Sequence, residues 1–208
     1  MILHIHKSTG IIYFIQLLNT MRGNINPFTS SEFALLGFLF DKPTHGYDLH
    51  KLITDPDGIG LIWNVKMSNL YAYLDKLDKK GYIHGTMQPG DTHPTRMEYH
   101  ITDAGKQAFE TWLDSIIQHP RDFRQEFMLR YYFLQKYQPE KVMTLCKRQH
   151  DECSTWLANT KVELDKVNAE NQFKKSVIQF RIVQIQSMIN WLYRLHIAIN
   201  KETENEEN

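Results

Sequence analysis

Two stretches between Gly81 and Thr102 have the alternating pattern of β-strands, whereas the chain on either side of them has the pattern of helices. Residues 82–87 and 95–101 alternate apolar and polar side chains, and a polar loop with two prolines separates them. Gly81 is placed to end the preceding helix in the left-handed conformation. Thr102 is placed to cap a helix that runs to about residue 117. The sequence therefore predicts a two-stranded hairpin enclosed between helices.

Three helices are predicted before this hairpin. Thr29 and Glu32 form a capping box, and the helix that follows, residues 33–40, is apolar nearly all round. Thr44 is expected to cap a second helix over residues 45–53, and Ser68 to cap a third helix that stops at Gly81. The side chains expected on the buried faces of the second and third helices are Tyr47, Leu49, Leu52, Ile53, Leu70, Tyr71, Tyr73, Leu74 and Leu77.

Three helices, a hairpin and a further helix follow one another in the order of a winged helix-turn-helix, which we expect over residues 27–118. Several short motifs at matching positions resemble the PadR family of transcriptional regulators. They are Leu35-Leu36-Gly37, Pro43-x-His45-Gly46-Tyr47-x-Leu49, Leu70-Tyr71-x-x-Leu74-x-x-Leu77-x-x-x-Gly81-Tyr82-Ile83 and Tyr99-x-Ile101-Thr102-x-x-Gly105. One departure is Ser68-Asn69, which stands where the family often has a small turn containing glycine. The resemblance implies a sequence-specific DNA-binding protein that acts as a dimer.

In such a motif the N-terminal residues of the second helix enter the major groove of DNA. Ser68 and Asn69 carry groups that can hydrogen-bond to base edges, with asparagine favouring adenine. Ser68 can instead serve only as a cap, and Tyr71 is either a phosphate contact or a core ring. The complete set of predicted DNA-binding residues is Lys66, Ser68, Asn69, Tyr71, Lys76 and, in the wing, His93 and Arg96.

Residues 119–200 show only helical patterns, which predict helices at about 121–136, 139–169 and 175–200. The part from Arg121 to Val167 resembles, more loosely, the longer C-terminal domain of the virulence-activator type within the PadR family. In the last helix, apolar residues recur with the spacing of a coiled coil. We expect this series to form a homodimer interface: Ile178, Ile182, Ile185, Ile189, Leu192 and Ile199.

Large apolar side chains of the same region suggest a pocket for a small aromatic or apolar effector. The candidates are Trp156, Phe180, Met188 and Trp191. The same residues can equally form the core of a dimer. No effector is needed to explain their presence.

The formal net charge is zero, with 24 basic and 24 acidic residues, but the charge is unevenly distributed. Residues 1–26 carry +2, residues 27–118 carry −4, residues 119–200 carry +5 and residues 201–208 carry −3. The negative charge of the predicted DNA-binding unit argues against strong non-specific binding, although charges farther apart than about 10 Å are screened. We expect residues 1–26 to be an extension, or a product of an upstream start codon, and residues 201–208 to be an acidic tail.

Several functional classes are disfavoured by missing motifs. No catalytic motif, phosphate-binding loop or set of metal ligands is found, so we expect no enzyme, cofactor or metal. The two cysteines, Cys146 and Cys153, are too few for a disulfide scaffold. No run of 18 apolar residues occurs, so a cytoplasmic protein is expected. The alternative to a DNA-binding regulator is a dimeric helical interaction protein without DNA binding.

Overall fold

The computed structural model describes residues 29–88 and 96–206, with only the backbone given for residues 201–206. The predictions for residues 1–26 and for His93 lie outside the described residues. In chain order the elements are α2 (Ser30–Phe38), β1 (Thr44–His45), α3 (Gly46–Ile53), a 3-10 turn (Ile59–Leu61), α4 (Met67–Lys79), β2 (Ile83–Gln88), β3 (Arg96–Ile101), α5 (Asp103–Leu113), a 3-10 turn (Pro120–Asp122), α6 (Phe123–Tyr137), a 3-10 turn (Pro139–Lys141), α7 (Val142–Asp165) and α8 (Gln172–Glu206). The fold is mainly helical with a small sheet, as predicted.

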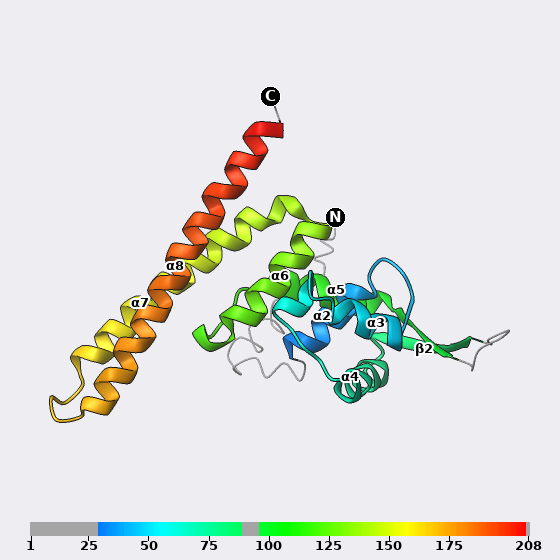
Figure 1. The fold of residues 1–208 in the computed structure, drawn as a ribbon, viewed down its shortest axis with the longest axis horizontal. Coiled ribbons are helices and arrows are strands. Elements are labelled where there is room, and N and C mark those ends of the chain that lie inside the picture. Colours follow the sequence, from blue (N-terminus) through cyan, green and yellow to red (C-terminus); the bar gives the residue numbers. More distant parts are fainter. Residues whose placement is uncertain (1–28, 89–95, 207–208) are drawn as a thin grey trace, which may run out of the picture.

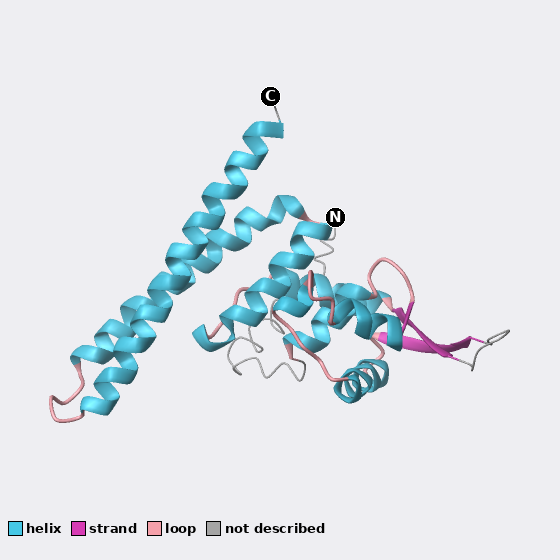
Figure 2. Ribbon diagram, in the orientation of Figure 1, coloured by secondary structure: helices cyan, strands magenta, loops and turns pink. Residues whose placement is uncertain are grey.

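The predicted hairpin is present, and a third strand extends it. The strands are antiparallel in the order β1-β3-β2, with Thr44 opposite Tyr99 and His84 opposite His100. Thr44 is therefore a strand residue, and the prediction that it caps the second helix is wrong; His45 stands at that N-cap. The reason is long-range, because β1 exists only where the folded chain brings it beside β3. Figure 2 shows this sheet projecting from the helices.

The predicted helix ends agree with the structure at three positions. Thr29 and Glu32 form the capping box of α2, Gly81 has a φ of 73°, and the Thr102 hydroxyl oxygen accepts a hydrogen bond of 3.1 Å from the Gly105 backbone nitrogen. The prediction for Ser68 is wrong, because α4 begins at Met67 with Lys66 as its N-cap. The buried Val65 fixes the chain just before this point, so the helix starts two residues earlier.

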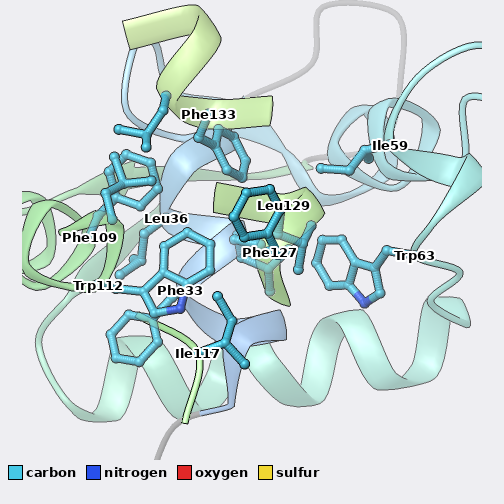
Figure 3. Close-up of a cluster of buried hydrophobic side chains, with 14 of the residues drawn as sticks. Phe33, Leu36, Ile59, Trp63, Phe109, Trp112, Ile117, Phe127, Leu129 and Phe133 are labelled. Carbon is cyan, nitrogen blue, oxygen red and sulfur yellow. The ribbon is translucent and has the colours of Figure 1, made fainter. Parts of the chain in front are cut away.

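The core of the winged helix forms around α2, which is buried on most sides as its apolar sequence predicts. Phe109 of α5 and Phe133 of α6 meet edge to face over Gly37, with ring centroids 5.3 Å apart (Figure 3). A methyl group at Gly37 would lie 2.6 Å from the Phe133 ring, so only glycine fits there without movement. The helix α6, expected in the C-terminal domain, thus contributes to the winged-helix core.

The expected buried face of α3 is only half correct. Leu49 and Ile53 are fully buried, but Tyr47 is 63% exposed and Leu52 is 45% exposed. An eight-residue helix that packs through one narrow stripe has room for two inward-facing residues, and the others face solvent. The correction leaves Tyr47 on the surface beside the sheet.

The last two helices form a long antiparallel hairpin that extends to the side of the molecule opposite the wing (Figure 1). Because α8 continues to Glu206, the first part of the expected acidic tail is helical. Lysine and glutamate are good helix formers, and no glycine or proline interrupts this stretch. None of the helices within the described residues is long and apolar enough to cross a membrane.

Candidate nucleic-acid interface

The helices α3 and α4 are held together in a fixed helix-turn-helix arrangement. The His50 Nε2 atom lies 2.9 Å from the Val65 carbonyl oxygen, and this contact joins α3 to the segment just before α4. On α4, the Tyr71 ring packs against Gly46 at the start of α3, where a methyl group would lie 2.8 Å from the ring. The start of α4 is therefore anchored from both sides.

The two faces of α4 differ sharply. Leu70, Leu74 and Leu77 are fully buried and turn one face into the core. Ser68 and Asn69 are exposed: Ser68 lies opposite the leucines, and Asn69 lies on the flank, about 100° from Leu70. At 100° per residue, the row directly opposite the leucines consists of Ser68, Ala72, Asp75 and Lys79.

Sequence reasoning missed Ala72 and Asp75, which are exposed in this outward row. The alanine methyl group is suited to contact a thymine methyl group, and an aspartate can accept a hydrogen bond from cytosine. Asp75 also pairs with Lys79 at 2.6 Å, which reduces the local charge. The sequence could have indicated them, because residues two and five places after the buried Leu70 lie on the opposite side of a helix.

The remaining predicted contacts of α4 have mixed outcomes. Lys66 is exposed at the N-cap of α4. Tyr71 is 45% exposed, so it serves both as a packing ring and as a surface hydroxyl. The Lys76 side chain is 39% exposed, and its Nζ atom lies 2.5 Å from Oε1 of Glu32 on α2. A DNA contact by Lys76 stays a prediction, in competition with this ion pair.

The wing presents one polar face. On this face His84 of β2 lies opposite His100 of β3, and their rings are stacked with centroids 4.9 Å apart. His100 Nε2 lies 3.1 Å from Glu98 Oε2 and 2.9 Å from the Thr86 hydroxyl. Arg96 is exposed at the start of β3, where a cation at the wing can meet a phosphate.

The opposite face of the wing is less polar. Met87 is 63% exposed, and Met97 lies across Gly85, where an added methyl group would be 2.7 Å from its sulfur. Farther along β3, burial raises the pKa of Tyr99 above 10.0, with Tyr71 and the acids of α4 adding to the effect. Tyr71 and the acids of α4 therefore lie near this face of the wing.

Comparison with known proteins agrees with this geometry. Residues 35–111 match the model of the transcriptional regulator PadR-like family. This part of the chain is a PadR-like domain.

Relatives of the PadR family resemble the chain over much of its length. The negative transcriptional regulator PadR of Bacillus subtilis (strain 168) is 28% identical over 138 residues, which are 66% of this chain and 75% of the relative. Among solved structures, Bacillus subtilis PadR in complex with operator DNA has a TM-score of 0.43 and 23% identity, covering 84% of this chain and 99% of that one. Bacillus subtilis PadR in complex with p-coumaric acid has a TM-score of 0.38 and 23% identity, covering 83% and 99%.

The apolar series on α8 that was predicted to form the dimer interface packs against another helix of the same chain. Ile178, Ile185 and Leu192 are at most 1% exposed, because α8 packs this stripe against α7. The half-buried members of the series are Ile182, Ile189 and Ile199. The three buried residues are therefore unavailable as a subunit interface, which corrects the prediction for them. A stripe at coiled-coil spacing shows that a helix is covered but not by which helix.

The four predicted effector residues do not form one pocket. Met188 and Trp191 line a groove of about 1030 Å³ between α8 and the start of α6. Trp191 meets Phe127 edge to face at 5.5 Å, so it connects the two helices. Trp156 is buried in α7 and Phe180 is 62% exposed; neither lines the groove.

The rim of this groove is basic, whereas its floor is apolar. Arg121, Arg124 and Arg181 surround the floor, and Arg181 also lies 3.3 Å from Glu163. In the part of the chain that the structure describes, no group of three His, Cys, Asp or Glu side chains is arranged to hold a metal ion.

Proposed function

We propose that the protein regulates transcription by binding an operator sequence through α4 and the β2–β3 wing. The observation that supports this most directly is the division of α4 into a buried leucine face and an exposed face with Ser68 and Asn69. Asn69 can form two hydrogen bonds with adenine, and Lys66 and Arg96 can neutralise phosphates. The proposal needs no enzymatic step, and it places the protein with its DNA in the cytoplasm.

The negative charge of the winged-helix unit indicates that base contacts contribute more to DNA binding than phosphate contacts do. Residues 27–118 carry a net charge of −4, and Lys76 and Lys79 each pair with a carboxylate. Few phosphates can therefore be neutralised, so the affinity should fall less steeply with salt than for a strongly basic protein. Discrimination between sequences must then come from the base contacts.

We also propose that the protein is a symmetric homodimer, now through the outer side of α8. Exposed apolar side chains follow the side of α8 that α7 leaves uncovered, and a contiguous patch of this kind is typical of an interaction surface. They are Phe173, Val177, Phe180 and Val183. A twofold axis would place two α4 helices on half-sites about one helical turn of DNA apart.

The groove between α6 and α8 is our candidate effector site. An apolar floor with Met188 and Trp191 suits a small aromatic or apolar body, and the rim arginines suit an acidic group. Because Trp191 also contacts Phe123 and Phe127, occupancy of the groove would act on α6 and hence on the winged-helix core. The boundary between the winged helix and the C-terminal dimerisation domain would then lie after α6.

The test of the proposed function is DNA binding by the intact protein. We expect the purified chain to bind a specific site in the DNA upstream of its own gene at least a hundredfold more tightly than unrelated DNA. The alternative, a dimeric interaction protein without DNA binding, is favoured only by the −4 charge. Equal, weak binding to every DNA tested would support that alternative and overturn the proposal.

A further inference from the structure

A buried acid lies behind the helix that faces DNA. Glu32 is 2% exposed and is the only fully buried carboxylate among the described residues. One of its oxygens accepts a hydrogen bond from the Thr29 backbone nitrogen, which is the capping-box contact. The other oxygen meets the ammonium of Lys76 from α4 at 2.5 Å. One side chain thus completes the start of α2 and also binds α4.

Lys76 lies on the same side of α4 as Asn69, so its ion pair with Glu32 can fix the orientation of Asn69. Asn69 and Lys76 are seven residues apart, almost two full turns, so they lie in one row along the helix. On the opposite flank, Tyr71 packs against Gly46 of α3. The helix is therefore held at both flanks, by Lys76 against α2 and by Tyr71 against α3.

The buried leucines alone would not define the rotation of α4 as closely. Contacts between apolar side chains are non-directional, whereas a buried ion pair requires one geometry. Removing Lys76 leaves the buried Glu32 carboxylate without this partner, and removing either side chain breaks a polar link between this flank of α4 and α2. A small rotation of α4 would move Asn69 away from the base edge that it has to meet.

We propose that Glu32 is a positioning residue for operator recognition: through Lys76, it sets the rotation of α4 that presents Asn69 to DNA. This inference rests on the proposed function of α4. It gives Lys76 a role within the protein in place of a phosphate contact. Glu32 and Lys76 then affect which sequence is bound, rather than how strongly any DNA is bound.

The test compares Glu32→Gln, Lys76→Met and the double variant, using full-length protein, fluorescently labelled operator and a scrambled duplex over a range of salt concentrations. Glutamine still accepts the Thr29 hydrogen bond, so Glu32→Gln removes the charge without removing the cap. We expect each single variant to lose about tenfold in operator affinity, with no change for scrambled DNA. The double variant should lose no more than either single variant, because both remove the same interaction.

Two matched variants separate positioning from simple structural damage. Lys76→Arg keeps a cation for Glu32 and should restore operator preference. Lys106→Met removes an exposed lysine that pairs with Asp103 on α5, outside α4 and the wing, and should leave the preference unchanged. Circular dichroism of each variant verifies that its helical content matches the wild type.

The opposing outcomes are distinct. If Lys76→Met weakens binding to both duplexes and reduces the salt slope by about one, Lys76 contacts phosphate and the inference is overturned. An unchanged sequence preference in Glu32→Gln and Lys76→Met also overturns it while leaving the proposed function standing. A wild-type protein without sequence preference overturns the proposed function itself.

Discussion

The hydroxyl of Tyr137 donates a hydrogen bond of 2.9 Å to the backbone carbonyl oxygen of Gly37, which fastens the last turn of α6 to α2. The neighbouring Lys136 pairs with Asp41 at 2.6 Å. At the middle of α6, the buried Arg130 donates to the Trp112 carbonyl oxygen at the end of α5. The helix α6 is thus joined to the winged helix by polar contacts as well as by its aromatic core.

Replacement of Tyr137 by phenylalanine should weaken this attachment without emptying the core. The ring stays stacked on Phe133, but the hydroxyl's hydrogen bonds to the Gly37 carbonyl oxygen and to Asp41 are lost, which should cost about 1 kcal/mol. Urea unfolding measures this loss. Tyr132→Phe is the matched control, because within the described part of the chain the Tyr132 hydroxyl makes no hydrogen bond. A Tyr137→Phe variant as stable as that control would contradict the assignment.

The pair of Asp41 and Lys136 should contribute a pH-dependent stability. The hydrogen bond from Lys136 lowers the pKa of Asp41 below 3.8, while the contact with Asp41 raises the pKa of Lys136 above 10.5 despite partial burial. A lowered acid pKa stabilises the fold above the unfolded value of 3.8, and the benefit disappears as the pH falls through the folded value. At the basic end, the benefit is lost as the pH rises above 10.5.

Asp41→Asn tests this window. Because both side chains are about half exposed, the expected loss at neutral pH is below about 1 kcal/mol. The difference between wild type and variant should shrink below pH 3.8 and again above pH 10.5. A difference in unfolding free energy that is constant across this range would show that the pair contributes no charge-dependent stability.

The two cysteines should be inert in the native protein. Both thiols are buried, and burial raises the pKa of Cys146 and of Cys153 to about 11. At pH 8 only about one thiol in a thousand would be ionised, and the thiolate is the reactive species. Iodoacetamide should label neither cysteine in the native protein at pH 8, and both in urea. Rapid native labelling would indicate an accessible, ionised thiol and contradict this prediction.

The corrected dimer surface predicts opposite results for two substitutions on α8. Ile185→Asp places a charge in the α7–α8 contact, where Ile185 is fully buried, and should destabilise the fold by about 3 kcal/mol or more. Phe180→Asp changes an exposed residue, so it should preserve the fold and weaken the dimer at least tenfold. Thermal unfolding and sedimentation equilibrium measure the two effects. If Phe180→Asp left the dimer intact and Ile185→Asp dissociated it without unfolding the protein, the isoleucine series would be the dimer interface.

The elements defined by neighbouring residues were predictable from sequence. Thr102 caps α5 because its oxygen reaches a nitrogen three residues on, and Gly81 ends α4 because glycine tolerates its positive φ. Both signals are local. The hairpin followed from its alternating pattern, and its position between helices identified the winged helix.

The features that sequence reasoning missed depend on long-range contacts. Thr44 has the chemistry of a cap, and only its position beside Tyr99 makes it a strand residue. Glu32 already had a role in the capping box, so nothing in the sequence indicated its second contact with Lys76. Phe109 lies three and four residues before Trp112 and Leu113, which predicts a buried face, but only the packing of α6 against α2 makes it the centre of the core.

The most direct test of the account is selection of bound sequences from random DNA, with the wild type and Asn69→Ala side by side. We predict that the wild type enriches an inverted repeat with half-site centres about 10 base pairs apart. We predict that Asn69→Ala loses an adenine preference at one position of each half-site, by about tenfold. Failure of the wild type to enrich any sequence, or an identical motif from both proteins, would contradict the assignment of α4 as the recognition helix.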